Sequence, residues 1–109
     1  MSPTIKTGEI WLAQLDPTLG SEIQKTRPCV VVSPDDMNAH LCTVIVAPMS
    51  TGSRPAAFRV PLTSQGKPGL IVLDQTRTLD RARLGRRLGV LRAPTLAITL
   101  QTLQAMFAA

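Results

Sequence analysis

Polar and charged residues follow apolar runs at three places in this 109-residue chain, and their types could act on a phosphate. They are Ser21, Glu22, Lys25, Thr26 and Arg27; Ser50 and Thr51; and Asp74, Gln75 and Arg77. A guanidinium donates two parallel hydrogen bonds to phosphate oxygens, so Arg27 is suited to stabilise a phosphate. Hydroxyl groups such as those of Ser50 and Thr51 can donate to the same phosphate. If the three groups meet in space, they could support phosphoryl chemistry.

Each group also has a purely structural explanation. Arg27 precedes Pro28 and could be an ordinary exposed loop arginine. Asp74 and Arg77 could form an ion pair that holds the exit of a strand, and Ser50 opens an ordinary turn sequence. The sequence alone leaves these alternatives open, because only the fold decides whether the groups converge.

Positive charge is concentrated near the C-terminal end of the chain, whose net charge is +5. We call six arginines there the basic stripe: Arg77, Arg81, Arg83, Arg86, Arg87 and Arg92. Such a stripe suggests nucleic acid or another polyanion as a partner, because arginine matches phosphate geometry. A solvated face that keeps the protein soluble is an equally good explanation of the charge.

Metal and cofactor chemistry have little support in the sequence. Cys29 and Cys42 lie in apolar runs without metal-ligand spacing, and we expect both thiols to be buried and reduced. His40 is the single histidine and is expected in a loop. No nucleotide-phosphate loop or zinc signature is present, so we expect neither a metal nor a cofactor.

Location and aromatic content bound the function further. No apolar run reaches the roughly 18 to 20 residues that span a bilayer, and residues 1–8 contain no apolar signal region. We therefore expect a cytoplasmic protein. Aromatic residues make up 3% of the chain, and Trp11 and both phenylalanines follow strand or helix patterns that place them in the core.

Short apolar runs separated by turn residues predict the elements that must position these groups. The expected strands cover residues 9–15, 28–33, 42–47, 57–62, 69–73 and 88–91, with Pro48 closing the third. A short helical turn is possible around residues 35–38. No helix fits between the strands, so a parallel sheet with crossovers is excluded.

The last part of the chain changes from strand to helix periodicity. Leu96, Leu100, Leu103 and Phe107 repeat at helical spacing after Pro94, which predicts one amphipathic C-terminal helix. The expected fold is therefore mainly β (α+β), a small barrel of about five to seven strands with a C-terminal α-helix. Residues 1–109 are expected to form a single domain.

Taken in order, the motifs resemble one family, the MazF/PemK-like (Kid/ChpB-type) toxins, over nearly the whole chain. The motifs are Gly8-Glu9-Ile10-Trp11, Leu15-Asp16-Pro17-Thr18, Gly20-Ser21-Glu22, Arg27-Pro28, Val31-Val32-Ser33-Pro34, Asn38, Pro48, Ser50-Thr51, Gly69, Asp74-Gln75 and Arg77-Thr78-Leu79-Asp80. The resemblance implies an SH3-like barrel that forms a homodimer and is silenced by a cognate antitoxin. It also implies metal-independent, sequence-specific cleavage of single-stranded mRNA, tRNA or rRNA. In that reaction the 2′-hydroxyl attacks the phosphate and leaves 2′,3′-cyclic phosphate and 5′-hydroxyl ends.

The resemblance also assigns site residues. Arg27 and Ser50 match catalytic or phosphate-contacting positions, and Thr51, the neighbour of Ser50, is assigned to the catalytic set with them. Arg27 is expected chiefly to stabilise the transition state, because a guanidinium rarely gives up its proton. The residues expected to contact RNA are Ser21, Glu22, Lys25, Thr26, Asp74, Gln75, Arg77, Arg81 and Arg83. The Kid branch has an arginine where this chain has Val72 and a histidine where it has Ser21, so its full acid–base set is absent and the general base stays open.

Two other functions remain as alternatives. One is a non-catalytic, CcdB-like toxin that binds a protein target such as gyrase. The other is a barrel that binds RNA or DNA without cutting it, which would keep the basic stripe and tolerate loss of Arg27 and Ser50. The cleavage motif cannot be read from the sequence, because specificity depends on variable loops, chiefly residues 50–57 and 64–69.

Overall fold

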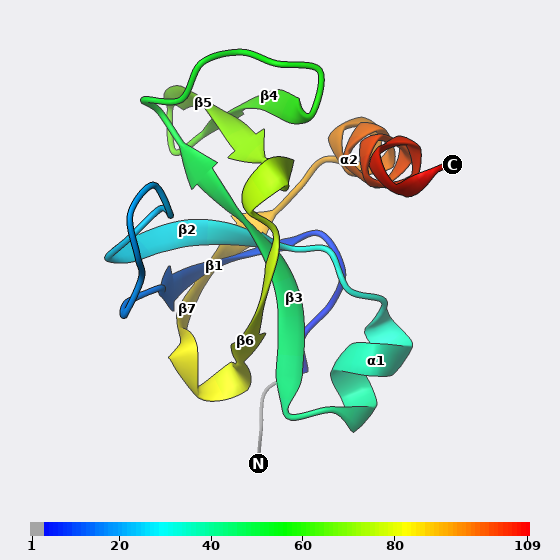
Figure 1. Ribbon diagram of the computed structural model, residues 1–109. Coiled ribbons are helices and arrows are strands. Elements are labelled where there is room, and N and C mark those ends of the chain that lie inside the picture. Colours follow the sequence, from blue (N-terminus) through cyan, green and yellow to red (C-terminus); the bar gives the residue numbers. More distant parts are fainter. Residues whose placement is uncertain (1–3) are drawn as a thin grey trace.

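The computed structural model describes residues 4–109, and the first three residues of the segment used to predict location lie outside this range. Residues 4–109 form seven strands, two α-helices and two short 3₁₀ turns (Figure 1). In chain order these are β1 (Glu9–Gln14), β2 (Thr26–Val31), α1 (Asp35–His40), β3 (Thr43–Ser50), β4 (Arg59–Ser64), β5 (Lys67–Val72), η1 (Leu73–Gln75), β6 (Arg77–Asp80), η2 (Arg81–Arg83), β7 (Leu84–Val90) and α2 (Ala93–Phe107).

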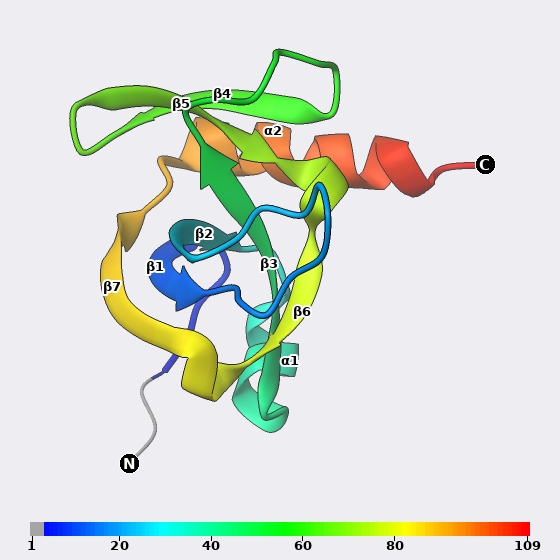
Figure 2. The same cartoon turned by 60° about the vertical axis from the view of Figure 1, so that its left-hand side comes forward.

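The strands form one curled antiparallel sheet in the order β4-β5-β3-β2-β1-β7, with β6 paired to β3. Strand β3 joins the two parts of the sheet, because residues 43–46 pair with β6 and residues 49–50 pair with β5. Figure 2 shows β7 curving around the outside of β1, while α2 lies along the β4–β5 hairpin. The expected small SH3-like barrel with a C-terminal helix is confirmed.

Two apolar clusters form the interior. The first lies around Trp11, Leu15 and Leu79, and the second lies around Ile10, Val60 and Ile71. Helix α2 closes the second cluster, where Leu96 and Leu103 pack against the buried residues. The predicted helix is confirmed, but its innermost residue is Thr99, whose hydroxyl donates to Thr95 O (2.8 Å).

Several predictions made from the sequence are wrong in detail. Pro48 does not end the third strand but is buried within β3, between the parts that pair with β6 and β5. Along the edge of β3 that pairs with β6 and β5, no strand residue lies opposite Pro48. The missing N–H of the proline is therefore tolerated. Strand β6 was missed because Leu79 is its only buried residue, and its pairing with β3 comes from a distant segment.

The side chains of three residues expected in the core are at the surface. Phe58 is 38% exposed, Phe107 is 80% exposed, and Cys42 is also exposed. Trp11 and Cys29 are buried as expected, and both cysteines are free thiols. Burial raises the pKa of the Cys29 thiol to about 12. His40 lies in the last turn of α1 rather than in a loop.

A buried carboxylate links the first strand to the last. Glu9, which is 7% exposed, accepts hydrogen bonds from Lys6 N (2.9 Å) and Trp11 Nε1 (3.1 Å) through Oε1. Its Oε2 accepts from Arg87 Nε of β7 (2.7 Å). Burial opposes ionisation of Glu9, but these hydrogen bonds and the Arg87 charge hold its pKa below the ordinary value. Glu9 therefore fixes β7 against β1.

Among residues 4–109, neither helix is long and apolar enough to cross a membrane.

Candidate active site

Arg27 and Ser50 are brought together by the register of β2 and β3. Cys29 pairs with Pro48 in this antiparallel ladder. Stepping two residues back from Cys29 and two forward from Pro48 leads to Arg27 and Ser50, so both lie at the same end of the strand pair. Thr51 follows directly at the end of β3. The sheet thus gathers the three predicted catalytic residues at its rim.

These residues line one pocket of about 180 Å³. Arg27, Pro28, Ser50 and Thr51 form one side of it, and the β4–β5 hairpin forms the other. The hairpin adds Ser64, Gln65 and Lys67, which the sequence analysis did not assign to the site. The sequence indicated these residues only indirectly, because residues 64–69 form one of the variable loops on which specificity is expected to depend. A pocket with one guanidinium, one ammonium and several hydroxyls suits a phosphate group.

Arg27 is exposed and is oriented by its own loop. Its Nε donates to Gln24 O (3.2 Å), which leaves the terminal nitrogens able to face a substrate. Ser50 Oγ accepts a hydrogen bond from Gly52 N (3.2 Å), so the hydroxyl proton can still be donated. Gly69 lies against this turn, where a Cβ would come within 3.2 Å of Ser50 O. A larger residue at 69 would therefore press on the site.

A second pocket of about 200 Å³ gathers four of the nine other predicted residues. Glu22, Asp74, Gln75 and Arg77 line it together with Thr76. Within the described part of the chain, Thr76 Oγ1 is a buried side-chain atom without a hydrogen-bond partner. The β1–β2 loop and η1 thus meet, although they line a pocket separate from that of Arg27.

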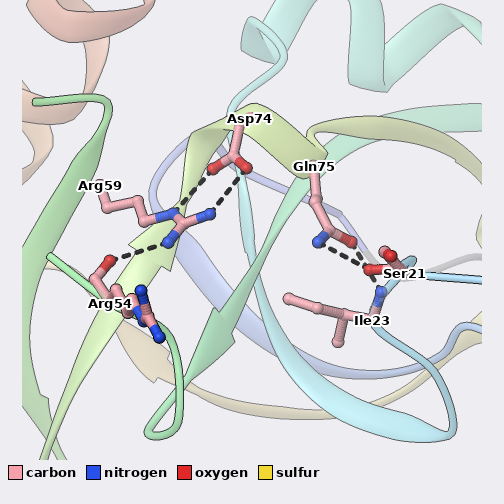
Figure 3. A network of polar contacts seen from close by, with 6 residues as sticks. All are labelled: Ser21, Ile23, Arg54, Arg59, Asp74 and Gln75. Atoms are coloured by element: carbon pink, nitrogen blue, oxygen red, sulfur yellow. Dashed lines mark hydrogen bonds and ion pairs between the residues drawn. The ribbon is translucent and has the colours of Figure 1, made fainter. Parts of the chain in front are cut away.

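Asp74 pairs with a residue that the sequence analysis did not consider. Its carboxylate accepts two hydrogen bonds from Arg59, at 3.1 Å from Nε and 3.0 Å from Nη2 (Figure 3). Arg59 also donates to Arg54 O (2.8 Å), and its Cζ lies 5.5 Å from the Phe58 ring centroid. The Arg59 hydrogen bonds lower the pKa of Asp74, and the same contact raises the pKa of Arg59. The suggested Asp74–Arg77 pair is therefore wrong, and Arg77 donates to Leu15 O (3.2 Å) instead.

Gln75 is engaged with the β1–β2 loop rather than pointing freely to solvent. Its Oε1 accepts from Ile23 N (2.6 Å), and its Nε2 donates to Ser21 O (3.2 Å), as Figure 3 shows. The side chain of Ser21 is exposed, and so are those of Lys25 and Thr26 farther along the loop. Lys25 has a positive φ of 70°.

Three arginines of η2 and β7, Arg81, Arg83 and Arg87, lie apart from both pockets and have structural partners. Arg81 donates to Asn38 O (2.7 Å). Arg83 donates to Gln14 O (3.2 Å) and to Asp16 O, while Arg87 is paired with Glu9. Several members of the basic stripe therefore hold loops and strands, and their contact with RNA stays a prediction.

Within residues 4–109, no three His, Cys, Asp or Glu side chains gather as a metal site would require. The fold and the pocket together define a class: a small curled barrel with an arginine and hydroxyl groups in a pocket at its rim.

The comparisons with known proteins identify the family. Residues 6–107 match the family described as PemK-like, MazF-like toxin of type II toxin-antitoxin system, and the chain belongs to this family. It is 42% identical over 90 residues to endoribonuclease PemK of Escherichia coli, covering 77% of this chain and 68% of that protein. It is 36% identical over 90 residues to endoribonuclease MazF of Staphylococcus epidermidis, covering 77% and 75% of the two chains.

The fold agrees with a solved member. The crystal structure of MazF from Deinococcus radiodurans superimposes with a TM-score of 0.84 at 25% identity, covering 96% of this chain and 97% of that chain.

Proposed function

We propose that this chain is the toxin of a type II toxin–antitoxin pair and an endoribonuclease that cuts single-stranded RNA at the Arg27 pocket. The observation that carries the site assignment is that Arg27, Ser50 and Thr51 line one pocket of about 180 Å³. Family membership supports the activity, since both curated relatives are named endoribonucleases. The CcdB-like and binding-only alternatives are not favoured, because neither accounts for those names.

The proposed reaction is internal transfer at the phosphate. The ribose 2′-oxygen forms a bond to phosphorus, the bond from phosphorus to the 5′-oxygen breaks, and the products are a 2′,3′-cyclic phosphate and a 5′-hydroxyl. One proton leaves the 2′-hydroxyl and one is supplied to the departing 5′-oxygen. Arg27 stabilises the charge that develops on the phosphate, with Ser50 and Thr51 as hydroxyl donors to its oxygens. No step needs a metal ion.

The proposal also covers the oligomeric state, the partners and the cellular location of the protein. The chain acts in the cytoplasm as a homodimer, on mRNA, tRNA or rRNA, and a cognate antitoxin blocks its RNA surface. RNA contacts from the second pocket, through Glu22 and Arg77, would extend the site along the strand. The description of the family as toxins of toxin–antitoxin systems supports the antitoxin.

The test is cleavage of a long single-stranded RNA by the purified protein in excess EDTA, with the ends mapped. We expect discrete cuts with 5′-hydroxyl ends. Arg27→Ala should lower the cleavage rate by about 100-fold or more while leaving the fold intact, because the side chain is exposed. Lys6→Ala removes an exposed cation outside both the pocket and the basic stripe and serves as the control. Intact RNA with wild-type protein, or near-normal cleavage by Arg27→Ala, would refute the activity or the site respectively.

A further inference from the structure

The orientation of Arg27 depends on a carbonyl that belongs to the β1–β2 loop. Arg27 Nε donates to Gln24 O, three residues earlier in the chain. The loop around Gln24 is exposed, and Lys25 adopts a positive φ of 70°. Such a conformation is strained for a residue with a side chain, so contacts outside the loop must hold it in place.

Gln75 provides two of those contacts from η1, more than fifty residues away. Its amide oxygen accepts from Ile23 N (2.6 Å), and its amide nitrogen donates to Ser21 O (3.2 Å). The two bonds grip the backbone on both sides of residue 22, so they restrain both the position and the rotation of the segment (Figure 3). Gln24 follows Ile23 directly in the chain, and the backbone oxygen of Gln24 accepts the hydrogen bond that orients Arg27.

We propose that Gln75 is a positioning residue for Arg27: it fixes the Ser21–Ile23 backbone, and this backbone places the Gln24 carbonyl that orients the guanidinium. The inference rests on the proposed function for its kinetic consequence. It assigns the Gln75 amide to the protein's own loop, in place of the RNA contact expected from the sequence. A shift of about 1 Å in a group that stabilises a transition state can lower a rate by about 100-fold.

The kinetic test uses two variants of different hydrogen-bonding capacity. Gln75→Met keeps the approximate length and volume of the side chain but removes both bonds. Gln75→Glu keeps the acceptor for Ile23 N–H and loses the donor to Ser21 O at neutral pH. We expect kcat to fall by about 10- to 100-fold in Gln75→Met, with KM changed by less than about 3-fold. We expect it to fall in Gln75→Glu as well, because a carboxylate oxygen would then face Ser21 O. Gln104→Met, at an exposed position of α2, is the matched control.

A double-mutant comparison separates positioning from direct RNA contact. The affinity of a single-stranded RNA is measured for Arg27→Ala and for Arg27→Ala with Gln75→Met, both under conditions without cleavage. If Gln75 acts through Arg27, the second change should lower affinity by less than about 2-fold. A further loss of about 5-fold or more would show that Gln75 touches the RNA and would overturn the inference.

A structural readout tests the inference even if the chain does not cut RNA. Hydrogen exchange of the Ile23 amide and of the Arg27 Nε–H is followed by NMR in wild type and Gln75→Met. Both should exchange at least about 10-fold faster in the variant, while α1 amides are unchanged. Faster exchange at Ile23 alone, with Arg27 Nε–H unaffected, would show that the loop contact does not reach the arginine. Absence of cleavage by wild type refutes the proposed function, whereas this result refutes the role of Gln75.

Discussion

Replacing Glu9 should destabilise the protein more than replacing any exposed carboxylate. Glu9→Ala removes the acceptor of three hydrogen bonds and the charge partner of Arg87. The indole N–H of Trp11 is buried and would be left without a partner, which costs about 1 to 3 kcal/mol. The Arg87 side chain is 49% exposed and would be rehydrated, so the lost ion pair contributes about 1 kcal/mol or less.

The expected total loss is about 3 kcal/mol for Glu9→Ala. Glu9→Gln keeps an amide oxygen for Lys6 N–H and Trp11 N–H but loses the charge and the acceptor of Arg87 Nε–H, so about 1 kcal/mol is expected. With a urea slope of about 1.5 kcal/mol/M, the midpoint of Glu9→Ala should fall by about 2 M. Trp11 is the only tryptophan and is buried, so its fluorescence reports unfolding directly.

The pH dependence provides a second check with a defined sign. The pKa of Glu9 is lowered in the folded state, so its contribution is complete above the unfolded value of about 4.3 and is lost as the pH falls through the folded pKa. The stability difference between wild type and Glu9→Gln should therefore shrink in acid. Asp36→Ala, at an exposed carboxylate, is the control and should change stability by less than about 0.5 kcal/mol. Equal midpoints for Glu9→Ala and Asp36→Ala at one protein concentration would refute the reasoning.

Four further outcomes are expected. Arg59→Ala should speed proteolysis of the β3–β4 loop, because the Arg59 guanidinium donates to Arg54 O in that loop. An unchanged rate of proteolysis would show that Arg59 does not hold the loop. A thiol reagent should modify exposed Cys42 rapidly and buried Cys29 only on unfolding, which mass spectrometry can follow. RNA affinity should fall as salt rises, with a shallower slope in Arg86→Ala if this exposed arginine meets a phosphate. Deleting residues 84–109 should abolish the cooperative unfolding transition, since β1 then loses its partner on one side.

The general architecture could be predicted from local sequence, because five of the apolar runs coincide with β1 to β5. Turn residues and the period of the C-terminal helix were equally local signals. Strand β6 gave no such signal, since a polar segment became a strand only through its pairing with β3. The prediction that Pro48 ends a strand is wrong for a similar reason. Whether a proline fits within β3 depends on which strands flank β3 at that point, and the local sequence does not show this.

In the candidate site, too, some residues could be assigned from local motifs, whereas others depend on contacts between distant segments. Arg27, Ser50 and Thr51 were assigned from motifs, and the register of β2 and β3 brings them into one pocket. The partner of Asp74 was not predictable, because Arg59 reaches it from another strand without any sequence pattern. Phe58 and Phe107 were misplaced because hydrophobicity and spacing do not show which elements will cover a side chain.

The pairing of β1 with β7 also sets the point during synthesis at which the barrel can be completed. A ribosome delivers the chain from its N-terminus, and a domain folds as its segments emerge. While β7 is still inside the ribosome, β1 has a neighbour on one side only, and Glu9 has no contact with Arg87. The barrel is completed only by β7, although every residue that lines the Arg27 pocket lies earlier in the chain. For an enzyme that cuts RNA, this order of assembly means that the pocket residues are synthesised before the strand that flanks β1 on its second side.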